Sequence, residues 1–148
     1  MKLTVAWIGR SKEPAIEALT NDYLKRVSRY AEASAMALKD EAALIKLSGR
    51  SAKNREKHML VLLDVRGKQL SSEEFAGFLA DCQDRNRGPL LFAVGAADGF
   101  SENARRSADF VLSLGKMTLA HELARVVLLE QIYRAFTILK GHPYHLGH

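Results

Sequence analysis

The chain has 148 residues, with 22 Lys or Arg against 17 Asp or Glu, and its formal net charge is +5 at pH 7. A chain of this length buries roughly two-thirds of its unfolded surface, which is enough for a hydrophobic core without disulfides or a structural metal. The positive charge favours an anionic partner such as RNA, although many basic proteins bind none. We therefore expect a single domain that spans residues 1–148.

The sequence also bears on the cellular compartment. The single cysteine cannot form an internal disulfide, and the apolar run at residues 3–8 is shorter than the core of a signal peptide. No apolar run approaches the length of about 20 residues that crosses a bilayer. We expect a cytoplasmic protein that does not enter a membrane.

In the first part of the chain, the apolar segment 3–8 predicts a buried strand that ends at Gly9. Apolar residues then recur at three- and four-residue steps from Pro14 to Tyr30, which predicts a helix. Residues 36–38 fit a short strand, whereas residues 41–47 fit either a helix or the continuation of a strand. Residues 49–57 are the most basic local segment and predict a solvated loop.

The second part of the chain repeats the alternation of strand and helix. Ser71 and Glu74 have the spacing of a capping box that opens a helix, on which Cys82 falls among the core side chains. Ser101 caps another helix in the same way. The predicted strands are residues 59–65, 90–94 and 110–114, and the final helix covers about residues 119–140. This order predicts an α/β fold with a mostly parallel sheet flanked by helices.

The final helix is apolar around most of its circumference, so it should be buried on more than one side. In a small domain we expect the sheet to cover one side only. The remaining surface then predicts contact with a second copy of the chain, and hence a homodimer.

Three predicted strands are followed by glycine: Gly67, Gly95 and Gly115. Open parallel sheets bind ligands beyond the carboxyl ends of their strands, so these glycines indicate a pocket. The alternative is that they only permit tight turns. Neither Gly95 nor Gly115 lies in the motif of a dinucleotide loop or of a phosphate-binding P-loop.

Two histidine patterns are candidates for metal sites. His121 begins a sequence like the zinc-protease motif, but Arg125 stands where the second histidine would be and cannot coordinate zinc. His142, His145 and His148 are spaced by three without a cysteine or carboxylate, and we expect no metal there. Tyr144 between two imidazoles fits stacking on a base and proton exchange, whereas the alternative is a frayed terminus.

The later part of the chain resembles a specific family. The segments that carry the resemblance are Phe92-Ala93-Val94-Gly95-Ala96-Ala97-Asp98-Gly99, Leu112-Ser113-Leu114-Gly115-Lys116-Met117-Thr118-Leu119-Ala120-His121, the run 125–135 and His142-Pro143-Tyr144-His145. They are similar to the ribosomal RNA large subunit methyltransferase H family, the 23S rRNA pseudouridine N3-methyltransferases of the SPOUT superfamily. The segment Leu62-Leu63-Asp64-x-x-Gly67-Lys68 fits as well.

The resemblance implies a sheet of about six strands with a C-terminal trefoil knot, a homodimer, and S-adenosylmethionine as cofactor. It implies cofactor contacts at Leu63, Gly95, Ala96, Gly115, Lys116, Met117, Thr118, Leu119 and Ala120. Two of these positions depart from the family, which usually has a second glycine where Ala96 stands and a proline where Ala120 stands. The region of residues 40–58 is also shorter than in many relatives.

The resemblance further implies methylation of N3 of a pseudouridine in 23S rRNA of the assembled ribosome. The imide proton must leave before N3 attacks, so a base or a cation is required. The candidates are Tyr144 and His145 in the tail and Arg125 and Arg134 in the final helix. We expect the tail to act on the cofactor loops of the other subunit. A competing hypothesis is an RNA-binding protein that has lost transfer activity, as Ala96 suggests.

Overall fold

The computed structural model describes residues 1–10, 12–49 and 57–146. Its centre is a five-stranded sheet with the order β2-β1-β4-β3-β5, in which every neighbouring pair is parallel. The strands are β1 (Lys2–Ile8), β2 (Glu32–Leu38), β3 (Met59–Gln69), β4 (Leu90–Val94) and β5 (Phe110–Ser113). The predicted parallel α/β fold is confirmed, with one strand fewer than the resemblance implied. The trefoil knot stays a prediction.

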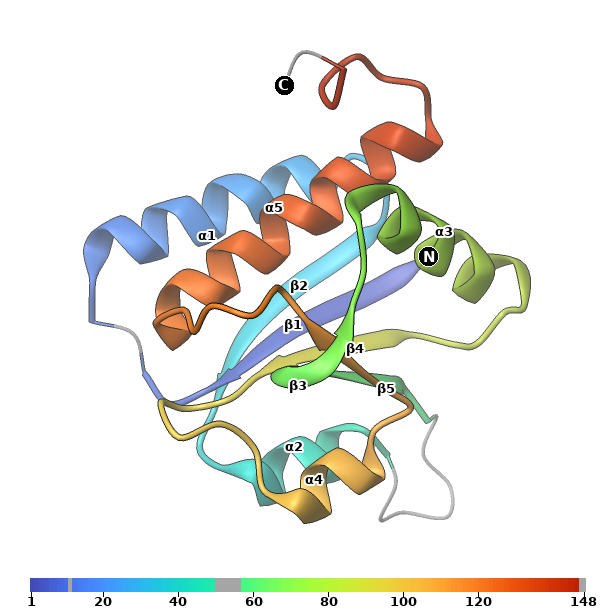
Figure 1. Cartoon of the computed structure of the whole chain (residues 1–148). Helices are drawn as coiled ribbons and strands as arrows, with labels where there is room; N and C mark the ends of the chain where they lie inside the picture. Colours follow the sequence, from blue (N-terminus) through green and yellow to red (C-terminus); the bar gives the residue numbers. More distant parts are fainter. Residues whose placement is uncertain (11, 50–56, 147–148) are drawn as a thin grey trace.

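Helices cover both faces of the sheet (Figure 1). One face carries α1 (Pro14–Val27), α3 (Ser72–Asp84) and α5 (His121–Leu139), and the other carries α2 (Glu41–Leu47) and α4 (Glu102–Ser107). Two buried clusters follow from this arrangement. The larger one joins the sheet to α1, α3 and α5, and the smaller one joins it to α2 and α4. The resulting three layers leave the carboxyl ends of the strands at one edge.

Local capping explains several helix boundaries. The side chain of Asp40 accepts a hydrogen bond from the backbone N–H of Ala43 at 2.9 Å, so the ambiguous segment 41–47 begins as a helix. The predicted capping box is present, because Glu74 N–H donates to Ser71 Oγ and Ser71 N–H donates to Glu74 Oε1. Residues 50–56 of the predicted basic loop lie outside the described residues.

The interior of α3 bears out the role predicted for Cys82. This side chain is buried, and its Sγ lies 3.4 Å from Sδ of Met59. Burial raises the pKa of the Cys82 thiol, which disfavours the reactive thiolate. Among the described residues, no helix is long and apolar enough to span a bilayer.

Strand β3 is longer than the predicted strand 59–65 and is interrupted. Leu112 of β5 pairs with both Leu63 and Lys68, so residues 64–67 leave the regular ladder between these two partners. Gly67 therefore lies inside β3, and the prediction that it ends the strand was wrong. A Cβ on Gly67 would lie 2.5 Å from the carbonyl oxygen of Val111, so close approach to β5 requires glycine here.

Helix α5 is buried on several sides, as predicted, but its neighbours differ from the expectation. Besides the sheet, both α1 and α3 pack along it. The inference that one small domain covers a single side of this helix was wrong, because two flanking helices cover the others. The apolar residues around α5 therefore do not by themselves indicate a homodimer.

Candidate active site

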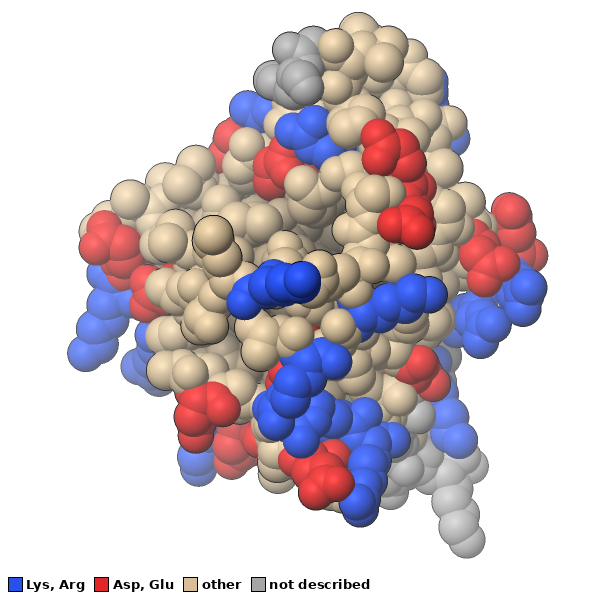
Figure 2. All heavy atoms as spheres, in the orientation of Figure 1, with Lys and Arg blue, Asp and Glu red and all other residues tan. Residues whose placement is uncertain are grey.

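A pocket with a volume of about 230 Å³ opens at the carboxyl ends of β3, β4 and β5. This volume is slightly below the usual range of sites for drug-sized molecules, about 300–1,000 Å³, so the pocket is a small, open site. Figure 2 shows a hollow near the middle of this face, with Lys and Arg side chains gathered on its lower side. The position agrees with the rule that parallel sheets bind ligands beyond their carboxyl ends.

Three chain segments build the pocket. They are the interrupted part of β3 at residues 63–66, the loop 94–99 after β4, and the loop 114–119 between β5 and α5. In the second loop, a Cβ on Gly95 would lie 3.1 Å from the carbonyl carbon of Gly99. In the third, Gly115 has a φ of 144°, and its N–H donates to the Ser113 hydroxyl at 3.2 Å. Gly95 thus permits a close approach of the loop to Gly99, and Gly115 permits a backbone conformation that a larger residue would strain.

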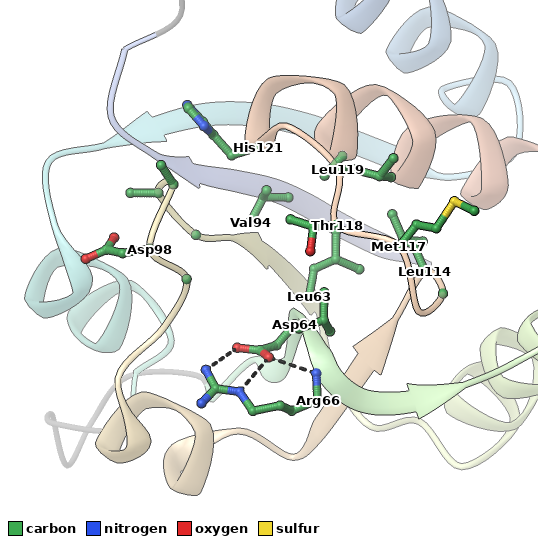
Figure 3. A pocket seen from close by; sticks show the side chains of 17 residues that line it. Leu63, Asp64, Arg66, Val94, Asp98, Leu114, Met117, Thr118, Leu119 and His121 are labelled. Atoms are coloured by element: carbon green, nitrogen blue, oxygen red, sulfur yellow. Dashed lines mark hydrogen bonds and ion pairs between the residues drawn. The ribbon is translucent and has the colours of Figure 1, made fainter.

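The lower wall of the pocket carries an ion pair between Asp64 and Arg66 (Figure 3). The Asp64 side chain is only 3% exposed, and it accepts hydrogen bonds from the backbone N–H and the guanidinium of Arg66. Burial by itself raises the pKa of the Asp64 carboxyl, but the hydrogen bonds and charge of Arg66 outweigh it and hold the pKa below its usual value. Asp64 therefore stays ionised beside the pocket.

Seven of the nine predicted cofactor residues line this pocket: Leu63, Gly95, Ala96, Gly115, Met117, Thr118 and Leu119. Lys116 and Ala120 do not, because Lys116 is exposed and Ala120 is the N-cap of α5. The pocket is also lined by four residues that were not predicted from the sequence: Asp64, Arg66, Asp98 and His121. Asp64, Asp98 and His121 stood inside the quoted motifs, which was the available signal for them.

Three predicted catalytic residues lie together near the C-terminal end of α5: Arg134 in the helix, and Tyr144 and His145 in the tail. Arg134 bonds Glu130 Oε1 through Nη2 at 2.6 Å and approaches Nδ1 of His145 through Nη1 at 3.0 Å. The Tyr144 hydroxyl donates to the same Glu130 oxygen at 3.0 Å. The other ring nitrogen of His145 lies 2.8 Å from Glu73 Oε1. Tyr144 and His145 of the tail thus contact α5 and α3, in contrast to the frayed alternative, whereas His148 lies outside the described residues.

These contacts set the protonation of two tail groups. Arg134 can only donate, so Nδ1 of His145 accepts and Nε2 carries the proton toward Glu73. Burial, together with the hydrogen bond to Glu130, raises the pKa of Tyr144 to about 12. The phenol therefore remains protonated at neutral pH and acts as a donor.

The fourth candidate, Arg125, is separate from the tail. Its side chain is 2% exposed, and its guanidinium carbon lies 3.9 Å from the centroid of the Trp7 ring. Burial lowers the pKa of Arg125, and the charges of Glu122 and Glu17 oppose that effect. The structure therefore brings Arg134, Tyr144 and His145 together and places Arg125 near the start of α5.

The pocket and the tail lie at opposite ends of α5. His121 and Ala124, in the first turn, line the pocket, whereas the tail follows the last turn. A helix of 19 residues is about 28 Å long at ~1.5 Å per residue. The tail therefore does not reach the pocket of its own chain in this conformation.

Comparisons with known proteins cover nearly the whole chain. A family model described as "Predicted SPOUT methyltransferase" matches residues 1–145. A ribosomal RNA large subunit methyltransferase H from Koribacter versatilis is 55% identical over 148 residues, which are 100% of both chains. A protein of the same name from Geobacter sulfurreducens is 43% identical over 152 residues, covering 98% of this chain and 99% of that one.

Solved structures agree in fold. The SpoU methyltransferase AviRb from Streptomyces viridochromogenes, in complex with the cofactor AdoMet, matches with a TM-score of 0.53 at 14% identity. The match covers 90% of this chain and 57% of AviRb. The putative methyltransferase Lpg2936 from Legionella pneumophila, with bound SAM, matches with a TM-score of 0.51, over 91% of this chain and 66% of that chain. Together, the family model and the full-length relatives show that the chain belongs to the SPOUT methyltransferases, in the ribosomal RNA large subunit methyltransferase H family.

Proposed function

We propose that this protein is an S-adenosylmethionine-dependent methyltransferase that methylates N3 of a pseudouridine in 23S rRNA. The observation that carries the proposal is the pocket at the ends of three parallel strands, in a chain that matches ribosomal RNA large subunit methyltransferase H relatives over its full length. The cytoplasm, where ribosomes are found, is the corresponding compartment.

The residues of the pocket fit this cofactor. Leu63, Val94, Leu114 and Leu119 provide apolar walls for the adenine ring, and the carboxylate of Asp98 on the facing loop matches a hydroxyl or ammonium group. Gly95 and Gly99 leave their backbone open to close approach, because neither carries a Cβ. When bound, the cofactor supplies a methyl group that a sulfonium already activates.

The chain itself has to orient the acceptor and remove its proton. His145 in its neutral form offers Nδ1 as the acceptor, provided that the imide N3–H of the substrate replaces Arg134 as the donor. The proton would move from N3 to Nδ1, which would leave the nitrogen free to accept the methyl group that the bound cofactor would supply. Arg134 then lies beside the developing imide anion, and the Tyr144 hydroxyl orients the acceptor as a hydrogen-bond donor.

This mechanism requires two copies of the chain. The tail and the pocket of the same subunit lie at opposite ends of α5, which is roughly 28 Å long. The tail residues therefore act on the pocket of a partner. The loop before α5 and the first turn of this helix expose apolar side chains that a partner would cover: Met117, Leu119 and Leu123. These two observations support a homodimer with composite sites.

Mixing two inactive variants tests the composite site. Gly95→Val blocks the cofactor loop, and Tyr144→Phe with His145→Ala removes the tail groups. A heterodimer of the two has one site with both defects and one with neither, so activity should return to a fraction of wild type. Verified heterodimers without activity would place each site within one subunit.

Calorimetry with S-adenosylmethionine tests the enzyme against the RNA-binding alternative. Micromolar binding, together with transfer of labelled methyl to ribosomes, supports the enzyme. Absence of binding at millimolar cofactor supports a binding protein that has lost transfer.

We further propose that the substrate is folded rRNA in an assembled ribosome or subunit. The chain offers little surface for reading sequence, and its basic residues provide mainly phosphate contacts that are sensitive to salt. Ribosomes should therefore be methylated far more efficiently than the corresponding naked stem-loop at physiological salt. Equal rates on both substrates would contradict this.

A further inference from the structure

The ion pair in the pocket wall has two charges that differ in exposure. The Asp64 side chain is 3% exposed, whereas the Arg66 side chain is 57% exposed. Arg66 Nε and Nη2 donate to the two carboxylate oxygens at 3.1 and 3.2 Å, and the Arg66 backbone N–H donates to Oδ1 at 2.9 Å. The carboxylate is thus covered by its own partner. A ligand that approaches from solvent meets the guanidinium.

Asp64 also fixes the direction of the Arg66 side chain. Residues 64–67 leave the regular ladder between β3 and β5, so strand pairing does not hold this segment. The bidentate contact with a nearly buried carboxylate holds it instead. Among the described residues, Nη1 of Arg66 has no hydrogen-bond partner, so part of the guanidinium fork is available to a ligand.

Two further cations belong to the segments around the pocket. Arg105 lies in α4, the helix after the loop that follows β4. Burial raises the pKa of the Asp64 carboxyl, whereas Arg66 and then Arg105 lower it, so the charge of Arg105 acts at the ion pair. Lys116 is exposed in the loop 114–119. Arg66, Arg105 and Lys116 are called the basic rim below, and Figure 2 shows Lys and Arg side chains gathered beside the hollow.

The ligand of the basic rim should be an anion other than the cofactor. S-adenosylmethionine carries a sulfonium and an ammonium group against one carboxylate, so its net charge is positive and a set of cations repels it as a whole. RNA carries a negative charge at every phosphate. Figure 3 also shows Arg66 on the opposite side of the pocket from the apolar side chains of Met117 and Leu119. The apolar walls and the basic rim are therefore separate.

We propose that the basic rim binds backbone phosphates of the substrate RNA next to the target nucleotide, with Arg66 as the central contact and Asp64 as the residue that orients it. The proposal rests on the proposed function, since it assigns part of the RNA-binding surface of the same enzyme. Phosphate contacts fix the register of a nucleic acid on a protein without reading its sequence. The rim thus places the target base at the pocket.

Binding to purified ribosomes over a range of salt concentrations tests the rim. Arg66→Gln and Lys116→Gln should each make the slope of log affinity against log salt less steep by about 0.7–0.9, as expected for the loss of one phosphate contact. Arg66→Lys keeps the charge but loses the bidentate contact with Asp64. It should bind ribosomes several-fold more weakly, at a nearly unchanged slope.

Lys25→Gln is the matched control, because it also removes one positive charge. Lys25 is exposed in the last turn of α1, which leads into the amino end of β2, whereas the pocket lies at the carboxyl ends of the strands. Its slope should remain that of the wild type. A change in Lys25→Gln equal to that in Arg66→Gln would show a general effect of net charge and would overturn the proposal.

Affinity for S-adenosylmethionine separates the rim from the cofactor site. The Arg66 and Lys116 variants should bind the cofactor as the wild type does, which also reports that they are folded. The second probe is 5′-methylthioadenosine, which lacks the amino-acid part of the cofactor. If Arg66→Gln weakened binding of S-adenosylmethionine but not of 5′-methylthioadenosine, Arg66 would belong to the cofactor carboxylate, and the proposal would be wrong.

A wild-type slope in folded Arg66→Gln would also overturn the proposal. If Arg66→Gln does not fold because Asp64 loses its partner, Lys116→Gln decides by itself, since Lys116 is an exposed loop residue. An unchanged slope in Lys116→Gln would then refute the rim. Wild-type protein that binds no cofactor would instead refute the proposed function, and the salt dependence, which needs no cofactor, would still decide on the rim.

Discussion

At the scale of single residues, the glycines of this chain differ in the space that a larger side chain would find. Gly67 lies where β3 returns to β5, and a Cβ there would lie 2.5 Å from Val111 O and 2.6 Å from Val111 C. Both are backbone atoms, which cannot rotate away. Gly77, in the interior of α3, has no atom within 4 Å of an added Cβ.

Gly67→Ala should therefore destabilise the protein by about 1–3 kcal/mol, the usual cost of forcing extra volume into a packed site. Gly77→Ala should stabilise it by about 0.5–1 kcal/mol, because alanine is the better helix former. Urea unfolding of both variants measures the two free energies. A Gly67→Ala protein as stable as wild type would mean that β3 and β5 can separate at this point.

Substitutions at the neighbouring residues Gly95 and Ala96 should differ in their effect on cofactor binding. A Cβ on Gly95 would lie 3.1 Å from Gly99 C and 3.2 Å from Phe100 Cε2, so Gly95→Val should push the loop out of place and weaken cofactor binding by at least tenfold, about 1.4 kcal/mol. Ala96→Gly removes a methyl group at the pocket and should bind the cofactor as well as wild type. Calorimetry on both variants decides this, and normal binding by folded Gly95→Val would remove the loop from the site.

At the scale of elements, the tail is held by side chains of two helices. Glu130 of α5 accepts from Tyr144 and Arg134, and Glu73 of α3 lies 2.8 Å from His145. The hydrogen bond with His145 lowers the pKa of Glu73. Because the pKa of this carboxyl is depressed in the folded state, its contribution is present above the ordinary value near 4.5 and is lost as pH falls through the lower folded pKa.

A carboxyl NMR titration should accordingly give Glu73 a pKa below 4.5 in the wild type. His145→Ala should raise this pKa toward its ordinary value, since the largest cause of the shift is removed. Glu74 provides an internal control: its pKa is lowered by Ser71, so it should not change in His145→Ala. An unchanged Glu73 titration in the variant would mean that the tail does not rest on α3 in solution.

At the scale of the whole molecule, apolar side chains remain exposed around the start of α5. Met117, which lines the pocket, is 85% exposed, and Leu123 in the first turn of α5 is 50% exposed. In the proposed homodimer, a partner covers them and brings its tail to this pocket.

Leu123→Glu should therefore shift the protein toward monomers and reduce methyl transfer by at least tenfold, with cofactor binding largely retained. Met36→Glu is the matched control, because Met36 is also an exposed large apolar residue but lies on the edge strand β2. Sedimentation and methyl transfer, measured at the same protein concentrations, test both variants. Dimers of Leu123→Glu with full activity would place the interface elsewhere.

The sequence by itself determined most elements and their type, because their signals are local, but it left residues 41–47 open between helix and strand. Alternating apolar strands and capped helices predicted the parallel α/β fold, and the capping box at Ser71 was read correctly. The quoted motifs also led to the loops at Gly95 and Gly115, since glycine after a buried strand is visible in the sequence. Seven of the nine expected cofactor residues line the pocket for this reason.

The tertiary structure decided what depends on packing between distant segments. The interruption in β3 comes from its register with β5, so neither the role of Gly67 nor the placement of Arg66 in the pocket was visible locally. Which sides of α5 are buried depends on where α1 and α3 pack, and the periodicity of the α5 sequence does not specify this. Arg125 looked like a catalytic cation in sequence, and only the fold brings it onto Trp7, because residues 118 positions apart meet when β1 and α5 pack together.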